Sequence, residues 1–122
     1  MTDTKRILVV EDDLFLSMVM IKMIQQLGHQ TLVVAHTEDQ AVDIALENHP
    51  DLIIMDVSLK DGNGVSAMMK IHEHYDVPVI FVTGDTEMIF QYNNQVKVLN
   101  TPRLEKPVMM GDLRQVFTSV FN

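Results

Sequence analysis

The stretch DLIIMDVSLKDGNG, residues 51–64, joins an apolar run to an aspartate and a polar turn. Its run of Leu-Ile-Ile-Met at residues 52–55 is apolar without alternation, which is typical of a strand covered on both faces by helices. The segment ILVVEDD, residues 7–13, has the same arrangement of an apolar run followed at once by acids. Two such runs in one short chain favour a parallel sheet buried between helix layers.

Short β-branched and apolar runs alternate along the chain with longer periodic segments. Pro78 precedes the fourth run, where its missing N–H group does not weaken a sheet, and Gly28 follows the first periodic segment, as is common at helix C-termini. The predicted strands are Arg6–Val10, Thr31–Ala35, Asp51–Met55, Val79–Val82 and Arg103–Glu105. The predicted helices are Leu14–Leu27, Glu38–Asn48, Val65–Tyr75, Thr86–Asn93 and Met110–Phe121.

This succession of five strand-helix units predicts an α/β fold. The expected form is a flavodoxin-like doubly wound sheet of five parallel strands in the order 2-1-3-4-5, with five helices on its two faces. In such sheets ligands bind outside the carboxyl ends of the strands, near the point where the strand order reverses. We therefore expect functional residues directly after the strands.

The composition and charge exclude several classes of function. The 122 residues, 47% hydrophobic and 21% charged, suit one globular domain, and no apolar run approaches the roughly 20 residues of a membrane span. A formal charge of −8 argues against a nucleic-acid partner, because such partners usually bind a basic surface. The absence of cysteine excludes disulfides and thiolate zinc sites, and with a polar N-terminus it favours a cytoplasmic protein.

Polar side chains follow the predicted strands at the edge where ligands are expected. Glu11 and Asp12 follow the first strand, Asp56 the third and Lys106 the fifth, while Thr83 lies at the end of the fourth. Three carboxylates in one cleft repel one another, and a hard divalent cation such as Mg²⁺ is the usual compensation. The sequence thus predicts a magnesium site at which Asp56 acts as a nucleophile towards a phosphoryl group and Lys106 neutralises charge.

Four segments resemble, in order and spacing, the receiver domain of bacterial two-component response regulators. They are ILVVEDD at 7–13, DLIIMDVSLKDGNG at 51–64, VIFVTGDT at 79–86 and RLEKP at 103–107. The resemblance covers nearly the whole chain and implies that Asp56 is the phosphoacceptor. It also implies that Asp12 binds Mg²⁺ directly, that Glu11 acts through water, and that the backbone carbonyl of Ser58 is a further metal ligand.

The same resemblance implies roles for the other pocket residues and a set of partners. Thr83 matches the switch hydroxyl, and Lys106 matches the phosphate-contacting lysine, whose peptide bond to Pro107 is typically cis in the family. We expect a single receiver domain over residues 1–122, without an output domain. It would take its phosphoryl group from a sensor histidine kinase or a histidine phosphotransfer protein and signal through a downstream protein target. Such a domain assists its own phosphorylation and dephosphorylation but is not an enzyme in the usual sense.

Two residues depart from the pattern of the family. Lys60 stands where the family usually has a proline in the loop after the phosphoacceptor, so we expect a less rigid loop. Arg103 stands where many receivers have the aromatic residue that moves with the switch hydroxyl. We therefore expect phosphorylation to be read out differently from the usual way.

Other interpretations stay open on the residues alone. One is a magnesium-dependent phosphatase that forms an aspartyl phosphate, although such enzymes commonly have a second aspartate two residues after the nucleophile, where this chain has Ser58. Another is an interaction module whose pocket is only a network of salt bridges. Asp12 and Asp13 could also be a simple acidic helix N-terminus, which the helix dipole favours.

The first predicted helix has apolar residues on more than one side. Leu14, Met18 and Ile21 are left over from the core face, and they allow either a wide buried face or a docking surface for a kinase or phosphotransfer helix. His72 and His74 are separated on their predicted helix, so we expect them to be solvated rather than metal-binding. The residues that suit a core face are Leu16, Val19, Met20, Met23, Ile24 and Leu27.

Overall fold

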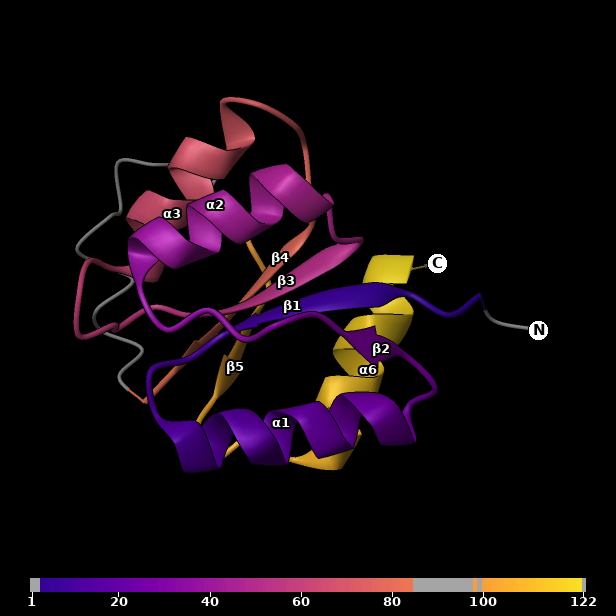
Figure 1. Cartoon of the computed structure of the whole chain (residues 1–122). Coiled ribbons are helices and arrows are strands. Elements are labelled where there is room, and N and C mark those ends of the chain that lie inside the picture. Colours follow the sequence, from indigo (N-terminus) through magenta and orange to yellow (C-terminus); the bar gives the residue numbers. More distant parts are fainter. Residues whose placement is uncertain (1–2, 85–97, 99, 122) are drawn as a thin grey trace.

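A computed structural model of the chain shows a five-stranded parallel sheet between two layers of helices (Figure 1). The structure describes residues 3–84, 98 and 100–121. The helix predicted over Thr86–Asn93 therefore lies outside the described residues. None of the helices that the structure describes has the length and apolar character needed to cross a membrane.

The sheet has the predicted strand order. Its strands are β1 (Arg6–Val10), β2 (Gln30–Thr31), β3 (Leu52–Asp56), β4 (Val79–Thr83) and β5 (Arg103–Glu105). They lie in the order β2-β1-β3-β4-β5, and each pair of neighbours is parallel. Because β1 and β3 are neighbours at the point where the order reverses, the residues that follow them meet at one edge of the sheet.

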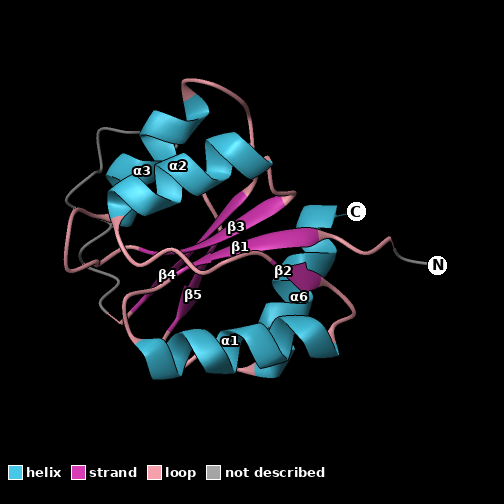
Figure 2. Ribbon diagram, in the orientation of Figure 1, coloured by secondary structure: helices cyan, strands magenta, loops and turns pink. Residues whose placement is uncertain are grey.

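The helices form one layer on each face of the sheet. The described helices are α1 (Leu14–Gln26), α2 (Glu38–Asn48), α3 (Gly64–His72) and α6 (Met110–Phe121). Helices α2 and α3 cover one face, and α1 and α6 cover the other (Figure 2). Four of the five predicted helices are thus present in the part of the chain that the structure describes.

Alternate residues of the central strands face opposite helix layers. In β1, Leu8 and Val10 pack with the α2–α3 layer, whereas Ile7 and Val9 pack with the α1–α6 layer. Strands β3 and β4 divide in the same way. Each fully buried aliphatic side chain contributes about 1.5–3 kcal/mol, so this two-sided burial explains why the central strands β1, β3 and β4 are mostly apolar.

The second strand is shorter than the predicted Thr31–Ala35. Strand β2 has two residues, and the chain after it keeps separate contacts with β1, such as the bond from the N–H of Ala35 to the carbonyl oxygen of Val9 (3.0 Å). An edge strand has one neighbour only, and the side chain of Val33 is exposed, so little burial supports a regular ladder here. The apolar composition of this segment therefore predicted too long a strand.

Helix α3 ends at His72, before the predicted Tyr75. The N–H groups of Glu73 and His74 bond to carbonyls three residues back, which tightens the chain beyond α3 into a narrower turn. His72 is partly buried, and its Nε2 lies 2.7 Å from the carbonyl oxygen of Val77. The prediction that His72 is solvated is therefore wrong, whereas His74 is exposed as predicted.

Two glycines shape the chain around the helices. Gly28 has a φ of 88°, in the left-handed region that glycine adopts without strain, and it follows α1 as predicted. Gly64 begins α3, where a Cβ would overlap the carbonyl oxygen of Asp56. This close approach brings the start of α3 against the end of β3, beside the acidic edge of the sheet.

Candidate functional site: an acidic cluster with a bridging lysine

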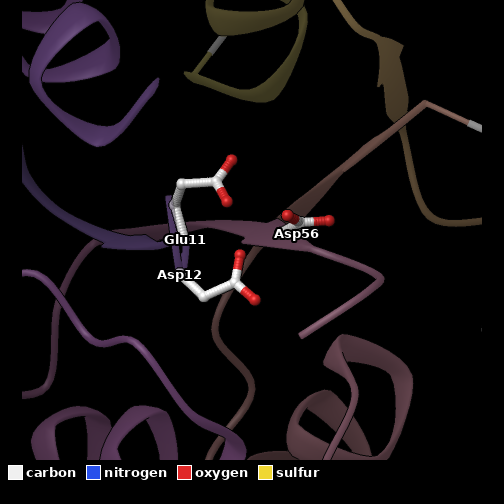
Figure 3. A group of neighbouring side chains, drawn as sticks. All are labelled: Glu11, Asp12 and Asp56. Carbon is white, nitrogen blue, oxygen red and sulfur yellow. The ribbon is translucent and has the colours of Figure 1, made fainter. Parts of the chain in front are cut away.

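Three carboxylates gather at the carboxyl edge of the two central strands. Asp56 is the last residue of β3, and Glu11 and Asp12 follow β1 directly. One oxygen of each carboxylate lies within 4.8 Å of an oxygen of each of the others. Figure 3 shows the side chains of Glu11 and Asp12 leaving the chain on opposite sides, with Asp56 beside them on the neighbouring strand. The predicted convergence of the three acids is confirmed.

Lys106 joins this cluster from the other side of β4. It follows β5, and its backbone N–H donates to the carbonyl oxygen of Thr83 (2.9 Å). Its Nζ lies 2.9 Å from Asp56 Oδ2 and 3.0 Å from Glu11 Oε1. The peptide bond between Lys106 and Pro107 is cis, as the resemblance implied. Lys106 therefore bridges carboxylates from two different strands.

Burial controls the charge of the cluster. Glu11 and Asp56 are 7% and 3% exposed. Burial, together with the contact to Asp56, raises the pKa of Glu11 to about 7, and the bond to Lys106 offsets only part of this shift. Burial opposes the charge of Lys106, but its bonds to Asp56 and Glu11 outweigh burial and raise the pKa of the ammonium group. One ammonium group among three carboxylates makes a site that suits a cation with oxygen ligands.

The raised pKa of Glu11 predicts a pH-dependent stability of the metal-free protein. Unfolding returns the pKa of Glu11 from about 7 to its ordinary value of 4.5. Between pH 4.5 and pH 7, Glu11 is therefore protonated to a greater extent in the folded protein than in the unfolded one. The free energy of unfolding should therefore fall as the pH rises from about 4.5 to about 7. Above pH 7 the titration of Glu11 should not lower it further. Urea unfolding in buffer with EDTA measures this dependence, and Glu11→Gln should weaken it. An equal slope in wild type and Glu11→Gln contradicts the prediction.

Asp12 and Asp13 differ in role although they are neighbours. Asp13 is exposed and caps α1, because its Oδ1 accepts a hydrogen bond from the N–H of Leu16 (3.0 Å). Asp12 instead contacts the loop after β3, where its Oδ2 accepts a hydrogen bond from the backbone N–H of Lys60 (2.8 Å). The interpretation as an acidic helix N-terminus is thus correct for Asp13 and wrong for Asp12.

Thr83 and Ser58 lie at neighbouring positions of the same edge. Thr83 is the buried last residue of β4, one position beyond Val82, which pairs with Asp56. Ser58 is exposed, and its backbone N–H donates to Asp56 Oδ1 (3.0 Å). The roles of the Thr83 hydroxyl towards a phosphate and of the Ser58 carbonyl towards a metal stay predictions.

Helix α1 has an apolar face that is open to solvent. Phe15 is 71% exposed, and Leu14, Met18, Leu16 and Val19 are exposed as well. The prediction of core positions at Leu16 and Val19, and the alternative of a wide buried face, are therefore wrong. The reason is that α1 packs on the sheet through a narrow stripe. The buried residues of the helix are Ser17, Met20 and Ile24.

A cavity of about 100 Å³ connects this apolar face with the acidic cluster. It lies between α1 and the segment that follows β5, and most of its lining is apolar. Glu11, Asp56 and Lys106 also line it, so an apolar surface and the charged groups share one cavity. Its apolar lining includes Leu16, Val19, Met20, Pro107 and Val108.

Glu38 is a buried carboxylate that sequence analysis did not single out. It is the first residue of α2 and is 8% exposed. An acid in the first turn of a helix is ordinary, because the helix dipole favours it there. No local signal in the sequence therefore distinguishes Glu38 from exposed Asp39 beside it.

The chain is an α/β domain with a doubly wound parallel sheet, and three acids and a lysine gather where its strand order reverses. A site of this kind suits a hard cation and a phosphoryl group. The family model described as "Response regulator receiver domain" matches residues 7–118. The chain belongs to this family, and it is therefore a signalling domain of the kind found in two-component systems.

Individual relatives agree with this assignment. The chain is 39% identical over 83 residues to "Phyllosphere-induced regulator PhyR" of Methylorubrum extorquens, which is 66% of this chain and 31% of that protein. It is 32% identical over 122 residues to "Polar-differentiation response regulator DivK" of Brucella ovis, covering 89% of this chain and 98% of DivK. The solution structure of the PhyR receiver domain from Erythrobacter litoralis superimposes with a TM-score of 0.84 at 26% identity, covering 96% of this chain and 89% of that one. The chain thus spans about a third of PhyR and nearly all of DivK.

Proposed function

We propose that Asp56 accepts a phosphoryl group from a phosphohistidine donor protein. A carboxylate oxygen of Asp56 attacks phosphorus, the P–N bond to the donor imidazole breaks, and an aspartyl phosphate forms. The observation that carries this proposal is the position of Lys106, whose Nζ lies 2.9 Å from Asp56 Oδ2 in a chain of the receiver family. The domain assists this transfer and the later hydrolysis of the aspartyl phosphate, while the donor is the catalytic partner.

The clustered carboxylates fit Mg²⁺, whose ligands in proteins are oxygens. Asp12, Asp56 and the carbonyl of Ser58 would hold it directly, and Glu11 would act through water. Bound there, Mg²⁺ would neutralise charge on the transferred group. The hydrogen bonds from the N–H of Lys60 to Asp12 and from the N–H of Ser58 to Asp56 orient the two carboxylates for this role.

Two further side chains complete the proposed phosphoryl site. The ammonium group of Lys106 would contact one phosphoryl oxygen, and the hydroxyl of Thr83 would donate a hydrogen bond to another. Phosphorylation would then shift the population of conformations at the end of β4. Arg103 is exposed on β5, at the place of the usual aromatic residue, so this shift would be read out without an aromatic side chain.

The exposed apolar face of α1 is the proposed docking surface for the donor, a sensor histidine kinase or a histidine phosphotransfer protein. The cavity beside α1 supports this placement, because it reaches from exposed Leu16 and Val19 to Asp56. The signal would pass on by contact with a downstream protein, in the cytoplasm and without a membrane partner. A net charge of −8 argues against nucleic acid as the target.

Incubation with acetyl phosphate and Mg²⁺, followed by mass spectrometry of the intact protein, tests this function. Wild type should gain the mass of one phosphoryl group, and Asp56→Asn should gain none. Asp61→Asn removes an exposed carboxylate of the same loop and should react like wild type. No gain in wild type would favour the interaction module, and turnover of excess p-nitrophenyl phosphate would favour the phosphatase.

A further inference from the structure

Glu38 is the centre of a hydrogen-bond network between α2 and α3. Its Oε1 accepts from the N–H of Asn63 (3.0 Å), and its Oε2 accepts from the hydroxyl of Ser66 (2.6 Å) and lies 2.7 Å from Lys70 Nζ. The backbone N–H of Glu38 donates to the carbonyl oxygen of Asp61 (3.0 Å). One buried carboxylate therefore contacts both the end of the loop after β3 and the first turns of α3.

The network favours the charged form of the Glu38 carboxylate. Burial disfavours the charge of Glu38, but the bonds from Lys70, Ser66 and Asn63 outweigh it and hold the pKa of the carboxyl group below its usual value. Both carboxylate oxygens face donors. An amide in the same place could keep the bonds to Asn63 and Ser66, because a hydroxyl can also accept, but its NH₂ group would face the ammonium group of Lys70. The site therefore distinguishes glutamate from glutamine mainly through Lys70.

The loop held by Glu38 is the one that leaves the phosphoacceptor. It runs from Val57 to Asn63, and a bridge between Ser58 and Asn63 closes it on itself. Gly62 packs so closely on Glu38 that a Cβ would overlap the Glu38 side chain, and its φ of 84° also favours glycine. Within this loop, Ser58 and Lys60 donate their backbone N–H groups to Asp56 and Asp12. The contacts of the two acids therefore depend on how the loop is held.

We propose that Glu38 is a positioning residue that fixes the loop after Asp56, through Asn63, Ser66 and the backbone of residues 61–62, so that the backbone of Ser58 and Lys60 lies correctly at the metal site. This inference rests on the proposed function of that site. It assigns to the α2–α3 layer an influence on metal affinity and phosphorylation that passes through this loop, although no side chain of α2 belongs to the acidic cluster in the described structure.

Magnesium binding to Glu38→Gln, measured by isothermal titration, tests the inference. Direct partners of metal ligands typically change metal affinity by 10–100-fold when they are altered. Glu38 acts one step further away, through the loop, so we expect the lower end of this range, a dissociation constant about 10-fold higher than that of wild type. Ser66→Ala removes one bond of the network and should give a smaller increase of about 3-fold. The rate of phosphoryl uptake from acetyl phosphate at low Mg²⁺ should fall in the same order, while saturating Mg²⁺ should restore most of it.

Asp39→Asn is the matched control, because it removes the same charge from the next, exposed position of α2. It should bind Mg²⁺ like wild type, and Glu38→Asp, which keeps the carboxylate, should recover part of the loss. Equal magnesium affinity in wild type and in folded Glu38→Gln overturns the inference, and if Glu38→Gln does not fold, equal affinity in Ser66→Ala overturns it. If wild type binds Mg²⁺ but takes up no phosphoryl group, the proposed function fails, and the magnesium affinities still decide the role of Glu38.

Discussion

Replacing Lys106 with methionine should slow phosphoryl uptake from acetyl phosphate about 100-fold, the usual effect of removing one charged group that stabilises a transition state. It should also destabilise the metal-free protein at pH 8 by about 3 kcal/mol, because the change leaves two buried carboxylates next to each other without their cation. The loss should shrink towards pH 5.5, where Glu11, with a pKa of about 7, is protonated in the folded protein. Stopped reactions analysed by mass spectrometry, with urea unfolding at both pH values, measure these effects.

Lys22→Met is the control for this change, because it removes an exposed lysine of α1. It should leave both the uptake rate and the free energy of unfolding near those of wild type. A folded Lys106→Met protein that is phosphorylated at the wild-type rate would contradict the assignment of Lys106 to the phosphoryl site.

Replacing Asp12 with asparagine should remove most of the stabilisation by Mg²⁺. A ligand present at about 100 times its dissociation constant stabilises the folded state by about 2.7 kcal/mol. For a domain of this size that corresponds to a rise in melting temperature on the order of 10 °C. Asp12→Asn keeps the size of the side chain and its acceptor for the N–H of Lys60 but loses the negative charge that binds the metal. Differential scanning calorimetry with and without Mg²⁺ measures the difference.

Asp13→Asn is a close control for Asp12→Asn. Asp13 is the adjacent carboxylate, but it caps α1, and asparagine is an equally good N-cap. Asp13→Asn should therefore keep the full magnesium-dependent rise in melting temperature. The same rise in wild type and Asp12→Asn would mean that the metal binds elsewhere or that Asp12 does not contribute to its site.

The strand order and the acidic cluster could be predicted from the alternation of strands and helices along the chain and from the polar residues at the strand ends. Asp56 comes at the end of an apolar run and Lys106 directly after the short strand Arg103–Glu105, and the carboxyl ends of parallel strands share one edge of the sheet. The contact between Lys106 and Glu11 joins residues that are far apart in the sequence. Strand order places both at one edge of the sheet, and the long side chain of Lys106 reaches across, because β3 and β4 lie between their strands. The resemblance to a family added the expected role of each residue.

Features that depend on side-chain packing could not be predicted in this way. Apolar spacing placed Leu16 and Val19 in the core, but the width of the buried stripe of α1 depends on what lies against the helix. Glu38 looks like an ordinary acid of a helix N-terminus, and only the approach of α3 makes it a buried network centre. The shortness of β2 reflects its place at the sheet edge rather than its own residues.

A crystal structure of the protein with Mn²⁺ in place of Mg²⁺ and with beryllium fluoride, a mimic of the phosphoryl group, tests the central claim most directly. The anomalous signal of the metal should lie within bonding distance of carboxylate oxygens of Asp12 and Asp56 and of the Ser58 carbonyl. The beryllium should be joined to Asp56, with Lys106 Nζ in contact with a fluorine. A metal bound away from Asp12 and Asp56, or a Lys106 side chain that does not reach the Asp56 adduct, would contradict the claim that these strand ends form one phosphoacceptor site.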